Sequence, residues 1–337
     1  MKAMILKNPA PIEQNPLEMA DLPVPVPASD QILIKVLVCG ACHTDLDLAE
    51  GRLQTAVSPV VPGHQVVGIV EDKGKNVARF RIGDRVGVTW LYWACGRCSH
   101  CRNHAENLCE NAKWTGKDAN GGYAEFMVIS EHFAHHLPAI FSDTQAAPLL
   151  CAGVIGYRTL RLAQLTDGQN IGLYGFGASA HIVIQLIKHK YPGCRVFVFT
   201  KAPEHAALAI KLGAEWVGRS GDQPPVKLAR VMDFTPVGQC VRDALQTLDR
   251  GGRLVINAIR KETPVPPLDY AQYLWLEREI KSVANVTRAD AEQFLPLAAE
   301  IPIVPTVEEF PLHQANEVLG FIKHSSLKAA GVLRISR

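Results

Sequence analysis

Four cysteines within fifteen residues are the residues most able to bind a metal ion. Cys95, Cys98 and Cys101 are separated by two residues each, and Cys109 follows after seven. Four thiolates this close together can form a closed tetrahedral shell, which suits zinc because zinc accepts soft ligands and has no geometric preference of its own. Unrelated surface cysteines and an iron–sulfur cluster are the alternatives. Because a closed shell leaves no position for a substrate, this lobe (about residues 93–112) is predicted to be a structural zinc site.

Three other segments carry residues of the types that bind metals. They are Cys39-Gly-Ala-Cys42-His43-Thr44-Asp45 after a strand-like run, Pro62-Gly-His64 at a turn, and Cys151 in an apolar run. Each has an ordinary explanation when taken alone. The Cys-x2-Cys-His letters also occur at haem attachment sites, a lone histidine is more often structural, and a buried thiol is usually inert.

A glycine turn between a strand-like and a helix-like segment indicates a dinucleotide site. The residues Gly175, Phe176, Gly177, Ala178 and Ala180 form a Gly-x-Gly-x-x-Ala pattern. The first glycine permits a tight turn, the second lets the backbone approach a pyrophosphate, and the small alanine allows close helix–strand packing. The start of the following helix then offers unpaired N–H groups to the phosphates.

The elements around these residues predict an α/β chain with two domains. Residues 170–174 and 195–200 read as strands on either side of a helix at 181–190, and strands continue to alternate with helices up to about residue 285. This alternation predicts a Rossmann-type, doubly wound parallel sheet over residues 150–285. The first 149 residues are rich in strands and loops, and a strand at 330–335 returns to them. A discontinuous β-rich domain of residues 1–149 and 286–337 is therefore expected.

Composition narrows the class of protein. The chain has 337 residues, a net charge of +2, 47% hydrophobic and 20% charged residues, which is typical of a soluble globular protein. Basic residues are not clustered, so no nucleic-acid or anionic-membrane partner is expected. The N-terminus becomes polar too early for a signal peptide, and no apolar run approaches the roughly 20 residues of a membrane span. Nine cysteines without a signal peptide favour reduced thiols, and thus the cytoplasm.

Taken together, these motifs resemble the zinc-containing alcohol dehydrogenases of the medium-chain dehydrogenase/reductase superfamily. The resemblance extends nearly from end to end and adds two further motifs, Gly-Gly-Tyr-Ala-Glu (121–125) and Ala-Pro-Leu-Leu-Cys-Ala-Gly (147–153). It implies a GroES-like catalytic domain beside the Rossmann-type domain, and two zinc ions per chain, one catalytic and one structural.

The resemblance also assigns roles to residues that were ambiguous when taken alone. It implies that Cys42, His64 and Cys151 bind the catalytic zinc and leave a fourth position for substrate, where a Lewis acid eases ionisation of an alcohol. Thr44 matches the hydroxyl that takes the substrate proton, and Asp45 matches the carboxylate that orients the ligand histidine. Cys39 matches a position that is not a ligand.

Further positions match the family's cofactor and substrate contacts, and some depart from its pattern. His43 is expected beside the pyrophosphate, and Trp90 and Leu91 are expected to line the substrate pocket. Gln65 stands where the family usually has glutamate, so a charge behind the zinc is lost. Asp47 stands where an outer proton-relay histidine is often found. A carboxylate can still accept that proton, but its pKa is lower than that of imidazole. The arginine that often contacts the pyrophosphate has no clear match near residue 331.

The expected cofactor is NAD or NADP, with a lean towards NADP. Enzymes that use NAD place an acidic residue at the end of the second strand, whereas Thr200 and Lys201 stand here. A hydroxyl and a cation tolerate or favour the 2′-phosphate of NADP, although Lys201 is equally compatible with the start of a solvated loop. Asn257 and Ala258, at the end of a later strand, are also expected to contact the cofactor.

The sequence therefore predicts reversible hydride transfer between a primary or secondary alcohol and NAD(P). A small-molecule alcohol, aldehyde or ketone would be the substrate, and a homodimer or homotetramer is expected. One alternative is a related reductase that acts on a C=C bond, which lacks the catalytic ligands. The other is a non-enzymatic, zinc-bearing binding or redox-sensing protein that uses the cysteine lobe.

Overall fold

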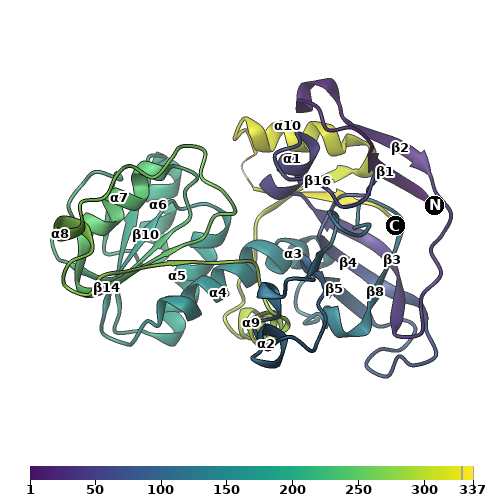
Figure 1. The fold of residues 1–337 in the computed structure, drawn as a ribbon, viewed down its shortest axis with the longest axis horizontal. Coiled ribbons are helices and arrows are strands. Elements are labelled where there is room, and N and C mark those ends of the chain that lie inside the picture. The colour runs from purple at the N-terminus through teal and green to yellow at the C-terminus, as the bar shows by residue number, and fades with distance from the viewer. Residues whose placement is uncertain (328, 337) are drawn as a thin grey trace. The chain divides into compact units, whose positions relative to one another are not determined.

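The computed structural model describes residues 1–327 and 329–336 of the chain, which fall into two compact units (Figure 1). Unit 1 comprises Met1–Cys151 and Asn285–Arg337, and unit 2 comprises Ala152–Ala284. The domain boundaries expected from the sequence, residues 1–149 with 286–337 and residues 150–285, stay a prediction. Among the described residues, no helix is both long enough and apolar enough to span a membrane.

Unit 1 is built mainly from strands. They are β1 (Lys2–Leu6), β2 (Leu17–Asp21), β3 (Gln31–Gly40), β4 (Gln65–Lys73), β5 (Arg85–Val88), β6 (Leu91–Trp93), β7 (Lys113–Trp114), β8 (Phe126–Ser130), β9 (Ala134–His136), β16 (Val307–Pro311) and β17 (Ala330–Arg334). The main sheet has the order β16-β17-β3-β4-β5-β9, and β8 pairs with the remaining part of β3. The hairpin β1–β2 and the small pair β6–β7 lie outside it.

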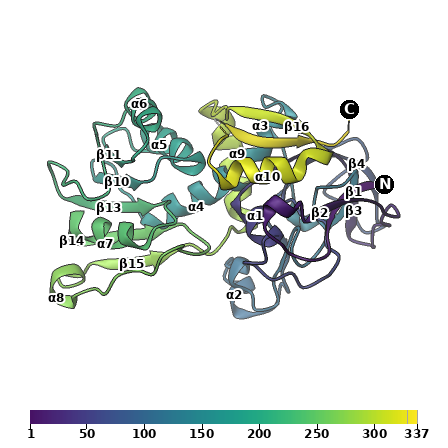
Figure 2. The same ribbon diagram turned by 90° about the horizontal axis from the view of Figure 1, so that it is seen from above.

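The C-terminal strand β17 returns to this sheet, as the sequence predicted, and lies between β16 and β3. β17 pairs antiparallel with β3, so that Val332 lies opposite Gly40 and Leu333 lies opposite Cys39. β16 joins on the outer side of β17 in parallel. Figure 2 shows the C-terminal helix α10 (Ala315–Lys323) beside α1 (His43–Ala49) near the start of the chain. The two ends of the chain therefore share one core.

The other helices of unit 1 are short or were not specified from sequence. They are α2 (Ser99–Arg102), α3 (Asp143–Pro148) and α9 (Arg288–Glu300). α9 begins with a capping box, in which Thr287 and Asp290 satisfy each other's backbone N–H groups. This helix was not predicted from the sequence, and it contains Pro296. α3 continues into a π-helix, Leu149–Gly153.

Unit 2 is built around a six-stranded, fully parallel sheet, whose strand order is β12-β11-β10-β13-β14-β15. Its strands are β10 (Asn170–Tyr174), β11 (Arg195–Phe199), β12 (Trp216–Gly218), β13 (Leu228–Asp233), β14 (Leu248–Ile256) and β15 (Glu279–Ser282). Its helices are α4 (Val154–Ala163), α5 (Ala178–Lys190), α6 (Pro203–Lys211), α7 (Gly238–Thr247) and α8 (Tyr270–Tyr273). This is the predicted doubly wound topology.

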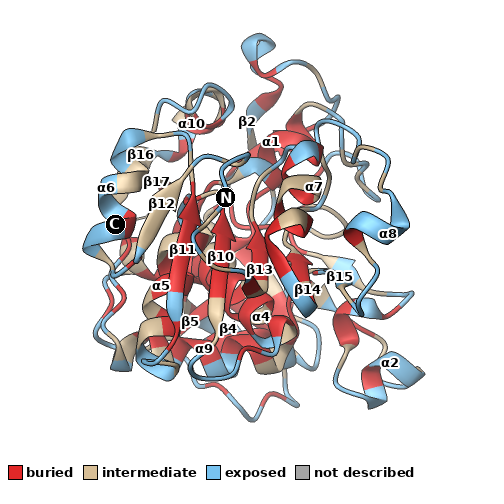
Figure 3. Ribbon diagram, turned by 90° about the vertical axis from the view of Figure 1, so that its left-hand side faces the viewer, coloured by how far each residue is buried: buried red, intermediate tan, exposed pale blue. Residues whose placement is uncertain are grey.

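The central strands explain why the sequence signal was strong here. β10, β11 and β13 are mostly buried (Figure 3), and the central strands of parallel sheets are typically apolar on both faces. The order of strands changes direction at β10, which has β11 on one side and β13 on the other. Ligands of such sheets bind at the carboxyl ends of the strands around this point.

Candidate functional site

Unit 1 brings together Cys42, His64 and Cys151, three residues that are far apart in the sequence. Their potential ligand atoms all lie within 4.8 Å of one another, and Cys42 Sγ is 3.5 Å from His64 Nε2. A tetrahedral zinc ion would separate a sulfur from a nitrogen ligand by about 3.6 Å, so this donor set fits zinc. Cys39 is fully buried and does not belong to this group of the described residues.

Local structure holds each of the three residues in place. Cys42 is the N-cap of α1, and its sulfur accepts a hydrogen bond from the Thr44 amide at 3.4 Å. His64 follows Gly63, whose φ of +92° makes the turn into β4. Cys151 lies in the π-helix that follows α3. Such single-turn irregularities of a helix are frequent at functional sites.

Asp45 lies directly behind the histidine. Its Oδ1 is 3.2 Å from His64 Nδ1 and accepts a hydrogen bond from the Gly63 amide at 3.3 Å, while its Oδ2 accepts one from the Cys42 amide at 3.0 Å. Both side chains are buried. A hydrogen on Nδ1 directed at the carboxylate leaves Nε2 free for a metal, which is the orientation that ligand histidines require.

The charges of this site fit a bound cation. Burial opposes a charge on His64, yet the Asp45 carboxylate and the Cys42 sulfur raise the pKa of His64 well above its ordinary value. Burial raises the pKa of Asp45, and His64 offsets part of this increase. A hydrogen bond with Cys151 lowers the pKa of Cys42 well below its usual range and raises the pKa of Cys151. The pocket therefore concentrates negative charge, which a divalent cation would neutralise in place of protons.

The cysteine lobe forms a second, separate group of ligand atoms. The sulfurs of Cys95, Cys98, Cys101 and Cys109 all lie within 4.8 Å of one another, and those of Cys95 and Cys101 are 3.9 Å apart. A tetrahedral zinc ion with four sulfur ligands requires about 3.8 Å. Hydrogen bonds from backbone N–H groups, those of Arg97 and Cys98, lower the pKa of Cys95 to about 6, whereas burial raises that of Cys101 to about 12.

The lobe is attached to the rest of unit 1 by a partly buried ion pair. Glu106, which is 3% exposed, accepts hydrogen bonds from the backbone N–H and the Nε of Arg288, both at 3.0 Å. Arg288 opens α9, so the C-terminal segment fixes the lobe. This contact joins residues 182 positions apart and could not be read from the local sequence.

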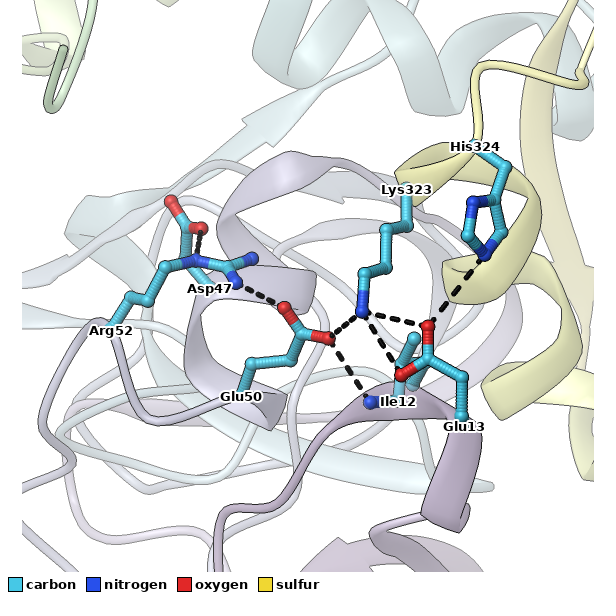
Figure 4. Close-up of polar contacts among 7 residues, drawn as sticks. All are labelled: Ile12, Glu13, Asp47, Glu50, Arg52, Lys323 and His324. Carbon is cyan, nitrogen blue, oxygen red and sulfur yellow. Dashed lines mark hydrogen bonds and ion pairs between the residues drawn. The ribbon is translucent and has the colours of Figure 1, made fainter. Parts of the chain in front are cut away.

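Asp47 makes a contact that the sequence did not predict. Its Oδ1 accepts a hydrogen bond from Arg52 Nε at 2.5 Å, and Arg52 also pairs with Glu50 (Figure 4). Asp47 is 6% exposed and lies one turn after Thr44 on α1. The position expected to serve as the outer proton relay is therefore held in an ion pair with Arg52.

Gln65 packs against the backbone instead of a charged partner. It opens β4 opposite Gly40, and a Cβ atom at Gly40 would lie 2.6 Å from Gln65 Oε1. The absence of a side chain at residue 40 thus makes room for the amide. Gln65 is buried beside the ligand His64, as its place in the sequence requires.

Aromatic rings adjoin the candidate metal site on one side. The ring of Trp90 lies 5.9 Å from that of His64, and the ring of Trp114 lies 5.2 Å from that of Trp90. Trp90 Nε1 is buried and has no hydrogen-bond partner among the residues described. Leu91, the other expected pocket residue, is 1% exposed. Trp114 was missed from sequence because only the pairing of β6 with β7 places it there.

In unit 2, the glycine turn has the shape that a dinucleotide needs. Gly175 follows β10 with a φ of +78°, and α5 begins at Ala178. Gly177 has φ −90°, and a Cβ atom built there meets no atom within 4 Å. The space beside its backbone is therefore open to a ligand. Ala180 and Phe176 are buried and contribute to packing.

The remaining cofactor positions lie on the same edge of the sheet. Thr200 and Lys201 follow β11, and Asn257 and Ala258 follow β14. The amide of Asn257 donates to the Asp233 carbonyl at 2.8 Å, which continues the pairing of β14 with β13. His43, in unit 1, is exposed at the start of α1. Contact of these residues with a cofactor stays a prediction.

Known proteins similar to this chain agree with the geometry. The model of the alcohol dehydrogenase GroES-like domain matches residues 28–139. A probable alcohol dehydrogenase, AdhA, of Mycobacterium tuberculosis is 45% identical over 99% of this chain and 97% of that protein. An alcohol dehydrogenase of Geobacillus stearothermophilus is 30% identical over 99% and 100%.

A solved structure extends the likeness to three dimensions. The cinnamyl alcohol dehydrogenase SbCAD4 of Sorghum bicolor has a TM-score of 0.86 and 26% identity, and the match covers 99% of this chain and 97% of that one. Full-length identity of 45%, a shared architecture and the matched domain lead to one conclusion. This chain belongs to the alcohol dehydrogenase family of the medium-chain dehydrogenase/reductase superfamily.

Proposed function

We propose that this chain interconverts an alcohol and its aldehyde or ketone by hydride transfer to and from a nicotinamide dinucleotide, with catalysis at Cys42, His64 and Cys151. The supporting observation is a buried donor set of two sulfurs and one imidazole nitrogen, backed by a carboxylate, in a chain of this family. Three protein ligands leave one position of a tetrahedral metal open, which is typical of catalytic zinc.

The residues around the three ligands have distinct tasks in this proposal. Zinc held there would act as a Lewis acid on the substrate oxygen. Asp45 holds His64 in the tautomer that presents Nε2. The hydroxyl of Thr44 lies two residues after Cys42 on the first turn of α1 and would take the proton of the alcohol. Asp47, fixed by Arg52, would receive that proton at the next step.

The cysteine lobe would hold a second zinc ion with a structural role. Its four sulfurs complete a tetrahedral shell and leave no open position. The proposal is therefore two zinc ions per chain, one in each cluster. A C=C reductase without the catalytic ligands, or a binding protein that uses only the lobe, would contain fewer than two zinc ions per chain.

The cofactor is proposed to be NAD or NADP, with a preference for NADP. No carboxylate follows β11, where an NAD enzyme would hold the ribose hydroxyls, and Thr200 and Lys201 take its place. The partners are a small-molecule alcohol or carbonyl compound and further copies of the chain in a dimer or tetramer. Cytoplasmic location belongs to the same proposal.

The test is to follow nicotinamide absorbance with a panel of primary and secondary alcohols, and with the matching aldehydes and ketones, using each cofactor. We expect turnover of at least one alcohol–carbonyl pair, faster with NADP(H). Zinc-loaded protein that turns over none of them with either cofactor contradicts the proposed activity. A strong preference for NAD(H) contradicts only the cofactor assignment.

A further inference from the structure

The pairing of β11 with β12 brings a second cation to the cofactor edge of unit 2. The two strands are parallel, and Phe199, the last residue of β11, lies opposite Gly218, the last residue of β12. The Thr200 amide donates to the Gly218 carbonyl at 2.8 Å. The residue after Gly218 is Arg219, so Thr200 and Arg219 leave the sheet side by side although 19 positions separate them.

Arg219 has no acidic partner among the described residues, in contrast to Arg195 and Arg253 of the same sheet. At the amino end of β11, Arg195 pairs with Glu215 at 2.7 Å, and Arg253 on β14 pairs with Glu279 at 2.9 Å. The exposed side chains of Arg219 and Lys201 have no hydrogen-bond or ion-pair partner in the described part of the chain. These two cations thus lie uncompensated at one edge of the sheet.

The acids near this edge do not neutralise the pair. The carboxylate of Asp222 accepts a hydrogen bond from the backbone N–H of Arg219 at 2.7 Å, which turns the chain after β12. Glu204 is exposed in the first turn of α6. Neither forms an ion pair with Lys201 or Arg219 among the residues described. The local charge therefore suits an anion.

The position of this pair relative to the glycine turn identifies the anion. Gly175 and Gly177 follow β10, which neighbours β11, so a dinucleotide with its pyrophosphate at the turn would place its adenosine ribose near the end of β11. Adjacent strands are about 4.8 Å apart, and β12 is the next strand outward. A phosphate on the 2′ position of that ribose would thus lie within reach of an arginine at residue 219.

We infer that Arg219, together with Thr200 and Lys201, forms the subsite for the 2′-phosphate of NADP, and that Arg219 is a principal determinant of the preference for NADP over NAD. The inference rests on the dinucleotide site of the proposed function. Guanidinium groups bind phosphate through two parallel N–H donors, which a lysine cannot match. The threonine hydroxyl can add a third hydrogen bond.

Calorimetric binding of adenosine 2′,5′-bisphosphate and of AMP tests this without requiring turnover. We expect the native protein to bind the bisphosphate more tightly than AMP. Arg219→Ala should weaken binding of the bisphosphate by about ten- to hundredfold, as expected when a charge-assisted contact is lost. The same substitution should change the affinity for AMP by less than about twofold. Arg195→Ala is the matched control, because it removes the same charge from the opposite end of β11. It should change neither affinity by more than about twofold.

The possible results separate the two proposals. Native protein that binds neither nucleotide contradicts the dinucleotide site itself. Native protein that binds AMP as tightly as the bisphosphate overturns only the 2′-phosphate subsite. An unchanged bisphosphate affinity in Arg219→Ala, or an equal loss in Arg195→Ala, overturns the role of Arg219. Thermal unfolding of each variant confirms that the exposed substitutions leave the fold intact.

Discussion

The seven cysteine and histidine residues that could bind metal in this chain show how surroundings decide what a residue can do. Cys95, Cys98, Cys101 and Cys109 complete a shell with one another, whereas Cys42, His64 and Cys151 supply only three donors. Behind the incomplete shell lies the buried carboxylate of Asp45, at 3.2 Å from His64. The same ligand chemistry thus serves structure in one place and, in our proposal, reaction in the other.

The contact of Asp47 with Arg52 gives a prediction for pH dependence. Replacing this carboxylate with histidine removes the ion-pair partner of Arg52 and introduces a side chain whose ordinary pKa is near 6.5. Because Asp47 is proposed to receive the substrate proton, the rate of alcohol oxidation by Asp47→His should fall as the pH decreases through about 6.5, where the new imidazole becomes protonated, and its pH profile should differ from the native one. Steady-state kcat measured from pH 5.5 to about 9 checks this. Superimposable profiles would show that Asp47 takes no part.

The two glycines of the dinucleotide turn give a second prediction. Alanine at residue 177 fits the backbone conformation and meets no protein atom, so stability should change by less than about 0.5 kcal/mol. Its methyl group would occupy the space of the pyrophosphate, and the Kd for either dinucleotide should rise at least about tenfold. Gly175→Ala is the contrasting variant, because its φ of +78° strains any side chain and should lower stability as well. Unchanged binding by Gly177→Ala would contradict the placement of the cofactor.

At the scale of elements, one carboxylate connects three segments of unit 1. Glu50 lies at the end of α1, and its side chain accepts hydrogen bonds from the Ile12 amide at 3.0 Å and from Lys323 of α10 at 2.8 Å (Figure 4). Lys323 also contacts Glu13 at 2.7 Å. Burial works against the charge of Glu50, but these donors and Arg52 lower its pKa to about 2.

Stability should reveal this connection and its pH range. Glu50→Gln should lower the free energy of unfolding at pH 7 by about 1–3 kcal/mol, because charged donors lose their partner. The native pKa of about 2 lies below the ordinary 4.5, so the contribution is complete above about pH 4.5 and is lost as the pH falls towards 2. Urea unfolding should therefore show a smaller difference in unfolding free energy between the native protein and Glu50→Gln at pH 3 than at pH 7. Glu18→Gln, in an exposed pair with Lys7, is the control and should cost less than about 1 kcal/mol. A difference that grows on acidification would contradict the role of Glu50.

Local pattern accounts for what the sequence could predict about these elements. The β10–turn–α5 unit was predicted because apolar periodicity and glycine spacing are encoded within some thirty residues. Only the first turn of α5 was missed, since Ala178-Ser-Ala180 carries no apolar periodicity. The ligand roles of His64 and Cys151 came from resemblance, because each residue taken alone looked ordinary. The pairing of Asp47 with Arg52, the packing of Trp114 against Trp90 and the placement of Arg219 beside Thr200 could not be predicted. Each depends on pairing, register or side-chain packing that no short motif encodes.

At the scale of the whole molecule, the chain divides its tasks between two units. Unit 1 holds both clusters of metal-binding residues, and unit 2 presents the glycine turn at the point where its parallel sheet changes direction. The ion pair that holds the lobe to the rest of unit 1 joins Glu106 and Arg288 and does not involve Cys42, His64 or Cys151. Loss of one cluster should therefore leave the other able to bind zinc.

The lobe variant tests this division. Cys98→Ser should contain one zinc ion fewer than the native chain and unfold at a lower temperature or fail to assemble, because metal binding contributes directly to the folding free energy of such shells. Zinc analysis, thermal unfolding and size-exclusion chromatography check it. A Cys98→Ser protein that is as stable and as assembled as the native chain, yet inactive, would show that the lobe takes part in the reaction.

The central claim is that catalysis depends on Cys42 and its two partner ligands while the cysteine lobe maintains the fold. The most direct measurement is the rate of alcohol oxidation by Cys42→Ser protein, made on samples whose zinc content is known. We predict one zinc ion per chain instead of two, a thermal unfolding temperature close to that of the native protein, and no detectable NAD(P)H formation. A folded Cys42→Ser protein with the native rate would contradict the account.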